Sequence, residues 1–203
     1  MPYLAALFPT REINNRTVFS SHAKTRAEIL GCLPNYRNLH DLKLVKGRFL
    51  TEEDNLSKSE VCVISSALSK TLFPFKDPLG QGVTTEGNLY DVVGVVAPQA
   101  ELKDESNLGF KELFEDNLYL PIETMWAKFF DYYYRAADGS NMISKITLRV
   151  EEPGKLFTIA RMIQDILESD HDMDDFQVTV PLELMEQAEK ARMTFIALMG
   201  LVA

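Results

Sequence analysis

The chain has 203 residues, of which 46% are hydrophobic and 25% are charged, and its formal net charge at pH 7 is −9. This composition supplies enough apolar side chains for a packed core, and it excludes a disordered chain, a collagen-like chain and a small disulfide-stapled protein. The acidic balance also argues against nucleic acid as a partner, because binding to phosphates requires a high density of lysine and arginine.

In the first half of the chain, short apolar runs separated by breaking residues predict several short strands. The predicted strands cover residues 3–8, 16–19, 25–30, 39–45 and 61–64. Pro9 follows the first of these runs, and Gly31 and Pro34 follow the third, so we expect the strands to end there.

Two hydroxyl residues in this half are expected to begin short helices. Thr51 precedes Glu-Glu-Asp and can accept a backbone N–H as a helix N-cap. Ser65 or Ser66 is expected to cap a second helix, which must end before Pro74. Residues 77–80 then predict a turn.

The next segment predicts a β-hairpin whose second strand lies inside a sheet. Residues 83–85 and 89–96 flank Glu86-Gly87-Asn88, which places a glycine where a hairpin turn needs positive φ. Residues 90–96 are apolar almost throughout, which is typical of a central strand.

The second half predicts a strand–helix–strand unit. After a short strand at residues 118–120, apolar residues alternate over 146–150, then recur at helical spacing over 156–167, and alternate again over 176–180. Such a βαβ unit should have parallel strands and a right-handed crossover. A further helical pattern begins at Pro181 and runs into the uncharged tail 195–203, which is either a buried helix end or the beginning of a membrane helix.

Aromatic residues after the strand at 118–120 are candidates for contact with a partner. Ile122, Trp126, Phe129, Phe130 and Tyr133 recur at helical spacing, which is more typical of a core. Tyr132 and Tyr134 fall off that spacing. Aromatic side chains are enriched at protein interfaces, so Trp126, Phe130, Tyr132 and Tyr134 form the candidate partner-binding set.

The catalytic and metal-binding templates find little support. Residues 21–24 match S-x-x-K without its companion motifs, and the glycine-rich nucleotide loops are absent. His22, His40 and His171 lie far apart in sequence and give no indication of a triad. Residues 170–174 imitate the start of a calcium loop, but Asp175 and Pro181 stand where glycine and glutamate are required, which favours a solvated loop.

The two cysteines leave two interpretations open. Cys32 and Cys62 are 30 positions apart and form no C-x-x-C motif. They are either bonded to each other in an oxidising compartment or are two buried free thiols, and we favour the second interpretation.

Seven short motifs follow one another along the chain: 31–36 (GCLPNY), 44–54 (LVKGRFLTEED), 61–64 (VCVI), 72–73 (LF), 77–81 (DPLGQ), 90–95 (YDVVGV) and 119–121 (YLP). The ordered set resembles the MacB-like periplasmic core domain of ABC transporter permeases. The resemblance implies an α+β fold, in which a porter-like βαβ subdomain carries an inserted, mixed and β-rich "sabre" subdomain.

The implied division of the chain has four parts. Residues 1–12 would begin the porter-like subdomain, 13–141 would form the sabre-like subdomain, 142–192 would complete the porter-like subdomain with the βαβ unit, and 193–203 would start a truncated transmembrane helix. The aromatic segment and loop at 126–141 are longer than this family pattern leads us to expect.

The resemblance also implies a non-catalytic domain without a cofactor, on the periplasmic side of the bacterial inner membrane. ATP would be hydrolysed on separate nucleotide-binding domains, and the domain would move with its flanking membrane helices to drive substrate export or lipoprotein extraction. The implied partners are an ABC ATPase, a second permease copy, and a periplasmic adaptor or a lipoprotein carrier. Two alternatives stay open: a free periplasmic binding module that uses residues 126–134, and an enzyme of unrecognised type.

Overall fold

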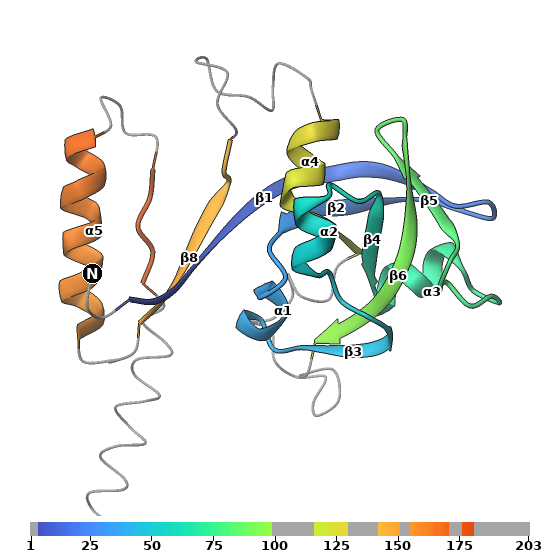
Figure 1. Ribbon diagram of the computed structural model, residues 1–203, viewed down its shortest axis with the longest axis horizontal. Helices are drawn as coiled ribbons and strands as arrows, with labels where there is room; N and C mark the ends of the chain where they lie inside the picture. The colour runs from blue at the N-terminus through green and yellow to red at the C-terminus, as the bar shows by residue number, and fades with distance from the viewer. Residues whose placement is uncertain (1–3, 99–115, 130–141, 151–154, 171–175, 181–203) are drawn as a thin grey trace, which may run out of the picture. The chain divides into compact units, whose positions relative to one another are not determined.

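The computed structural model describes residues 4–98, 116–129, 142–150, 155–170 and 176–180 (Figure 1). The chain divides into two compact units: unit 1 contains Met1–Ala6 and Leu148–Ala203, and unit 2 contains Leu7–Thr147. The naming of these parts as porter-like and sabre-like stays a prediction. The mixture of strands and helices is α+β, as predicted.

Eight strands and five helices are formed by the described residues. The strands are β1 (Leu4–Phe19), β2 (Lys24–Cys32), β3 (Leu42–Gly47), β4 (Val61–Ser65), β5 (Gly82–Thr85), β6 (Asn88–Pro98), β7 (Asn117–Pro121) and β8 (Lys145–Val150). The helices are α1 (Tyr36–Leu39), α2 (Glu52–Leu56), α3 (Ser66–Leu72), α4 (Ile122–Lys128) and α5 (Leu156–Asp170).

Six strands of unit 2 close into a ring. They pair in the order β2-β7-β4-β6-β5-β1, and β1 also pairs with β2. The β2–β7 and β4–β6 pairs are parallel, and the other pairs of the ring are antiparallel. β6 bonds to β3, β4 and β5, which confirms that the run at residues 90–96 is a central strand.

The ring has a separate apolar cluster on each face. Every strand of the ring contributes to the first cluster, which α3 and α4 complete with Leu68, Leu72 and Met125. The second cluster gathers Tyr36 of α1, Leu42 of β3, and the loop residues Phe49 and Leu50. Successive residues of a strand point to opposite faces, so Leu118 and Leu120 belong to the first cluster and Tyr119 to the second.

The predicted helix caps are present. The Thr51 hydroxyl accepts a hydrogen bond from the Asp54 backbone N–H at 3.2 Å, and the Asp54 carboxylate in turn accepts one from the Thr51 N–H, which makes a capping box. Of the two candidate serines, Ser65 is the cap of α3, since its Oγ accepts from the Leu68 N–H at 3.0 Å.

The β5–β6 hairpin is confirmed, and its turn requires positive φ at two residues, whereas the sequence suggested only one. Gly87 has a φ of 77°, as expected, and Glu86 also has a positive φ of 49°. Both central residues of the tight turn therefore adopt left-handed backbone, which matches the twist of the flanking strands.

Two glycines of the sequence motifs meet where β3 crosses β6. Gly47 lies directly opposite Gly94 in the β3–β6 register, and Gly47 has a φ of 68°. A Cβ added to Gly94 would stand 1.9 Å from the Arg48 carbonyl oxygen, and one added to Gly47 would stand 2.2 Å from the Val93 carbonyl oxygen. The backbones approach too closely for any side chain, which explains glycine at both positions.

The predicted strand breaks at Pro9 and Gly31 are wrong. β1 runs through Pro9 because its pairing with β2 starts only at Thr10, so the missing N–H of proline costs no bond to β2. Gly31 lies within β2, where a Cβ would stand 2.5 Å from the Met125 sulfur. Gly31 therefore allows α4 to pack closely against β2, and β2 continues through this residue.

The strand predicted at residues 39–45 begins later than expected. Tyr36–Leu39 forms the one-turn helix α1, and β3 starts at Leu42. A single helical turn is too short to produce an apolar periodicity that a sequence could reveal.

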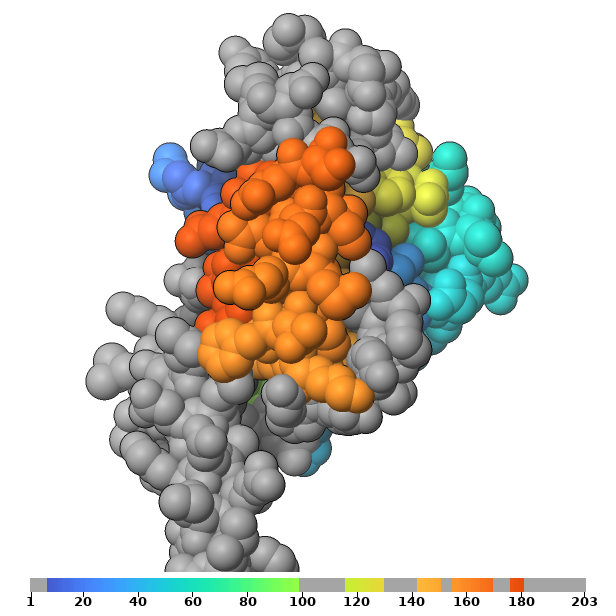
Figure 2. Space-filling view, turned by 90° about the vertical axis from the view of Figure 1, so that its left-hand side faces the viewer, coloured from blue at the N-terminus to red at the C-terminus, as the bar shows by residue number. Residues whose placement is uncertain are grey.

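In unit 1, the predicted helix at 156–167 is confirmed as α5 (Leu156–Asp170), which is drawn in orange in Figure 2. Ile159 is buried on this helix, whereas Phe157, Met162 and Ile166 are exposed. Residues 176–180 alternate between half-buried and exposed but do not form a strand, so the prediction of a second strand of the βαβ unit at these residues is wrong. Alternation fixes which way side chains point, whereas a strand also requires ladder pairing.

Among the helices of the described segments, none combines the length and the apolar content needed to cross a bilayer. The helix predicted from Pro181 and the tail 193–203 lie outside the described residues.

Candidate partner-binding surface

Trp126 is the one member of the candidate aromatic set within the described residues. It lies on α4, which packs against β2 through the contact between Met125 and Gly31. The indole Nε1–H donates a hydrogen bond to the Met142 carbonyl oxygen at 3.2 Å, and the ring is half-buried. Trp126 therefore has a fixed ring with part of its surface open to contact. Phe130, Tyr132 and Tyr134 lie outside the described residues.

Helix α2 lies against α4 and extends this surface (Figure 1). The Asn55 side-chain oxygen accepts a hydrogen bond from the Glu123 N–H at 3.1 Å, and the Thr124 hydroxyl donates to the Ser59 carbonyl oxygen at 3.0 Å. We call the surface formed by α2, residues 57–60 and α4 the α2–α4 surface.

Two ion pairs join the parts of the α2–α4 surface. Lys58 lies 3.9 Å from Glu123, and Lys128 pairs with Glu60. All four side chains are at least one-third exposed, so each pair adds little stability and is screened by salt. The charges leave the surface with both signs intermixed.

Leu56 is a surface residue that the sequence did not indicate. It is 79% exposed on α2, whereas its polar neighbours Asp54 and Asn55 are buried. Sequence patterns place leucine inside and carboxylates outside, and the five residues of α2 are too few to show the reversal.

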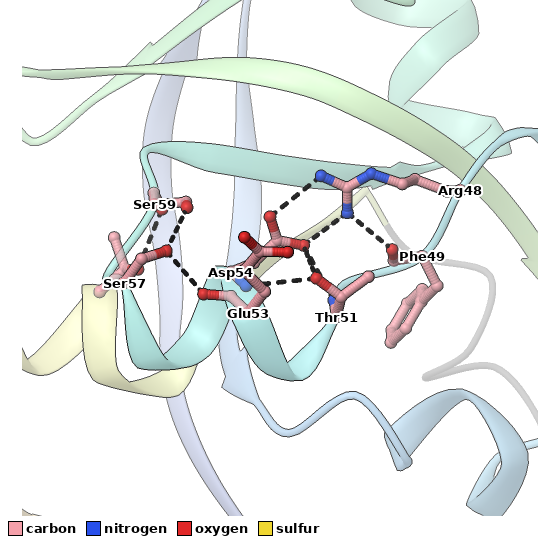
Figure 3. A network of polar contacts seen from close by, with 8 residues as sticks. Arg48, Phe49, Thr51, Glu53, Asp54, Ser57 and Ser59 are labelled. Carbon is pink, nitrogen blue, oxygen red and sulfur yellow. Dashed lines mark hydrogen bonds and ion pairs between the residues drawn. The ribbon is translucent and has the colours of Figure 1, made fainter.

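A polar network explains this reversal (Figure 3). The Arg48 guanidinium donates to the two Asp54 carboxylate oxygens at 2.5 and 3.0 Å, and the Thr51 hydroxyl donates to the same carboxylate at 2.8 Å. Burial raises the pKa of Asp54, but the hydrogen bonds from Arg48 and Thr51 outweigh it and hold the pKa below its usual range. The ionised carboxylate thereby fixes α2 to the chain that leaves β3.

Residues 1–166 match the sequence profile of the MacB-like periplasmic core domain. The chain belongs to this family. The match covers most of the chain, and α2, α4 and the Arg48–Asp54 network are all part of the MacB-like domain.

Curated relatives of the MacB-like domain are ABC transporter proteins. The chain is 27% identical over 201 residues to the macrolide export ATP-binding/permease protein MacB of Rhodospirillum rubrum, and the match covers 98% of this chain and 29% of that protein. It is 26% identical over 181 residues to the uncharacterized ABC transporter permease YknZ of Bacillus subtilis, covering 89% of this chain and 41% of that protein. The chain thus spans less than half of either relative.

Solved structures share the fold of the MacB-like domain. The periplasmic region of MacB from Actinobacillus actinomycetemcomitans matches with a TM-score of 0.70 and 22% identity, over 93% of this chain and 78% of that chain. The extracellular domain of the transporter YknZ from Gram-positive bacteria matches with a TM-score of 0.60 and 20% identity, over 80% of this chain and 75% of that chain.

The residues of the catalytic templates are engaged by their neighbours in the MacB-like domain. Ser21 and His22 share a hydrogen bond at 2.5 Å on an exposed turn, and the Lys24 ammonium lies over the Phe19 ring. His40 stacks on Tyr36, and His171 lies outside the described residues. Within the described segments, no group of three His, Cys, Asp or Glu side chains could hold a metal ion.

The two cysteines of the MacB-like domain are free and buried on opposite faces of the ring. Cys62 belongs to the first apolar cluster and Cys32 to the second, and β7 separates their strands. A disulfide between them is excluded in this fold, because the side chains point away from each other across the sheet. The favoured interpretation of two buried thiols is confirmed.

We therefore expect neither thiol to react in the native protein. Both side chains are fully buried, and burial raises the pKa of each thiol, so the reactive thiolate is not formed near neutral pH. Ellman's reagent should detect no thiol in buffer and both in concentrated guanidinium chloride. A Ser57→Cys variant, which places a thiol on an exposed residue, should react at once and serves as the control. Rapid reaction of the wild-type protein in native buffer would contradict the burial of Cys32 and Cys62.

His40 should make the stability of the MacB-like domain depend on pH. Burial lowers the pKa of His40, the nearby Lys145 lowers it further, and Asp41 partly opposes both. The unfolded chain then binds a proton more readily than the folded one, so stability falls as pH drops through the ordinary histidine pKa of about 6.5. Urea midpoints at pH 7.5 and 5.5 should differ less in His40→Gln than in the wild type; equal differences would contradict this role.

Proposed function

We propose that the chain is the periplasmic, non-catalytic part of an ABC transporter permease, and that it couples ATP hydrolysis in the cytoplasm to substrate movement outside. The family match over residues 1–166 carries this proposal. It is supported by a fold shared with the periplasmic region of MacB from Actinobacillus actinomycetemcomitans.

The proposed partners follow from the relatives. The Rhodospirillum protein is named as an ATP-binding/permease protein, so we expect this domain to work with an ABC ATPase, on the same chain or on a separate one. We further propose a second permease copy, anchorage in the bacterial inner membrane by flanking helices, no cofactor within the domain, and contact with a periplasmic adaptor or a lipoprotein carrier.

The decisive experiment uses the complete gene product with its ATPase in proteoliposomes. Replacing Leu7–Thr147 by a short linker should leave ATP hydrolysis measurable and abolish substrate transport, because the moving part is lost. As a control, an ATPase that lacks its Walker A lysine should show neither ATP hydrolysis nor substrate transport. Transport that survives the replacement would contradict the proposal.

The alternative of a free binding module makes an opposite prediction. A binding module should be stabilised by a small ligand when the chain is isolated from any membrane partner, because a ligand that binds only the folded state raises the melting temperature. Ligand-specific stabilisation of the isolated chain, together with no dependence of transport on it, would favour that alternative.

Trp126 gives a local test of the α2–α4 surface. Trp126→Ala should lower transport by about 10-fold while ATP hydrolysis continues, since truncating an interface tryptophan typically removes more than 1 kcal/mol of binding. Trp126→Phe keeps an apolar ring and should lose less. Equal transport by the alanine variant and the wild type would exclude Trp126 from the binding surface.

A further inference from the structure

Three exposed hydrophobic side chains gather at one end of unit 2. Phe19, the last residue of β1, is 42% exposed, and Leu89 on β6 is 57% exposed. Phe75, in the turn that follows α3, is 97% exposed. A single exposed leucine or phenylalanine is ordinary, whereas several of them close together indicate a contact surface.

A row of side chains across four strands places Phe19 and Leu89 on one face. In the strand register, Phe19 lies opposite Lys24 of β2 and Thr84 of β5, and the Lys24 ammonium is 5.1 Å from the centroid of the Phe19 ring. Thr84 in turn lies opposite Leu89. Opposed residues point to the same face and neighbouring strands are about 4.8 Å apart, so Phe19 and Leu89 are about 10 Å apart. Val18 belongs to the first apolar cluster, so this row faces away from that cluster.

A hydrogen bond joins the end of β1 to the end of α3. Ser20 Oγ donates to the Leu72 carbonyl oxygen at 2.9 Å, and it accepts from the N–H groups of His22 and Ala23 at 3.1 and 3.0 Å. The β1–β2 turn and the turn after α3 therefore meet at the same end of unit 2 (Figure 1). Phe75 is three residues beyond Leu72, which is at most about 11 Å of chain.

The turn that carries Phe75 is held in shape by its own residues. Phe73 is buried in the first apolar cluster, and its carbonyl oxygen accepts a hydrogen bond from the Lys76 N–H at 3.4 Å. Pro74 fixes φ at the first central position of this turn. An aromatic side chain on a rigid turn loses little conformational entropy on binding, which suits Phe75 for contact with a partner.

The same end of unit 2 is basic, although the net charge of the chain is −9. Lys24, Lys70 and Lys76 are exposed, and among the described segments no carboxylate forms an ion pair with any of them. Asp77 follows Lys76 in the sequence but pairs with Lys46. The exposed hydrophobic side chains therefore lie among positive charges that have no carboxylate partner in this part of the structure.

We propose that this end of unit 2 binds a segment of a partner protein in which carboxylates stand beside apolar side chains. We call this surface the basic end of unit 2, and it consists of Phe19, Lys24, Lys70, Phe75, Lys76 and Leu89. Its lysines attract the carboxylates of the segment, and the apolar side chains of the segment cover its three hydrophobic residues. That the partner belongs to the transporter rests on the function proposed above.

Charge distinguishes such a segment from an anionic membrane. Interactions between exposed charges are screened beyond about 8 Å at physiological ionic strength, so a short acidic segment responds to the lysines next to it. An anionic membrane is an extended surface, and it would also face the surplus of carboxylates on the rest of the chain, which it repels. The observations therefore favour a protein segment.

Photo-crosslinking in cells that produce the complete gene product tests the contact. The photoreactive residue p-benzoylphenylalanine in place of Phe75 should form an adduct with a second protein, and mass spectrometry should locate the adduct in a peptide that contains carboxylates and apolar residues. The same residue in place of Val45, which is 52% exposed on β3, is the control and should give several-fold less of this adduct. No adduct at position 75, or an adduct with a phospholipid or with a second copy of this chain, would overturn the proposal.

A pair of charge reversals tests the role of the lysines. Lys70→Glu changes the basic end of unit 2, whereas Lys43→Glu makes the same change on β3, and both lysines are exposed. Lys70→Glu should lower the yield of the adduct at position 75 by about 3- to 10-fold, because attraction of the carboxylates is replaced by repulsion. Lys43→Glu should leave the yield within about two-fold. Equal yields in the two variants would overturn the proposal.

Phe75→Ser separates this proposal from the proposed function. Because Phe75 is 97% exposed, its replacement should leave the urea midpoint unchanged, and a clear loss of stability would overturn its assignment as a contact residue. If both proposals hold, the variant should transport several-fold less substrate per ATP hydrolysed. The expected adduct in a wild type that transports nothing would overturn the proposed function and leave the binding surface standing. Full transport by Phe75→Ser would overturn the role of this surface in transport.

Discussion

Gly94→Ala should destabilise unit 2 by about 3–5 kcal/mol, enough to remove much of the stability of an ordinary domain. The added Cβ would stand 1.9 Å from the Arg48 carbonyl oxygen, and this obstacle is backbone that cannot rotate away. β3 and β6 would have to move apart, which would break the hydrogen bonds between them. Both strands contribute to the second apolar cluster, so its packing would be disturbed as well. Urea denaturation followed by circular dichroism measures the loss.

Gly80→Ala is the matched control for Gly94→Ala. Gly80 has a φ of 70°, but a Cβ there would meet nothing within 4 Å. Only the backbone strain of about 1–2 kcal/mol should appear. Equal losses in the two alanine variants would show that the clash at Gly94 is relieved by a local shift.

Asp54→Ala should cost about 3 kcal/mol and loosen α2. The Asp54 side chain is 8% exposed, and its carboxylate accepts hydrogen bonds from Arg48, the Thr51 N–H and the Thr51 hydroxyl. Removing it leaves the Arg48 guanidinium without this partner and opens the capping box. Denaturant unfolding gives the free-energy change, and hydrogen exchange should show that the amides of α2 lose protection first.

Glu53→Ala is the control for Asp54→Ala, because Glu53 is an exposed carboxylate on the same helical turn. Its replacement should change stability by about 0.5 kcal/mol or less. The two variants should also differ in acid. The lowered pKa of Asp54 means that its contribution is present above the ordinary aspartate pKa and is lost as pH falls through the folded-state pKa. Identical acid unfolding of both variants would contradict this assignment.

Local rules predicted the elements whose signals lie within a few residues. The Thr51 cap, the Ser65 cap and the β5–β6 hairpin each depend on one or two side chains and their immediate backbone, and all three are formed. The strand through Pro9 could not be predicted in this way. Whether a proline costs a hydrogen bond depends on where the partner strand begins, and that information lies in β2.

The candidate surface was predicted less completely than the fold. Trp126 could be chosen from its residue type, and the structure confirms only that its ring is half-buried and fixed to Met142. Leu56 was missed because its exposure results from the Arg48–Asp54 network, which buries the other side of α2. The hydrogen bonds that join residues 10–12 to Ser144 and Lys145 were missed because their partners are 132 or more positions apart in the sequence.

The closeness of Thr10 and Ser144 has a consequence for how such proteins diversify. The chain enters unit 2 at Leu7 and leaves it at Thr147, and 2.9 Å separates the Thr10 carbonyl oxygen from the Ser144 nitrogen just inside these points. A compact unit whose two ends meet can be exchanged for another, or transplanted between hosts, without rebuilding what surrounds it. Evolution can therefore exchange or vary this unit as a whole, and an engineer can insert it into another protein by joining two adjacent strand ends.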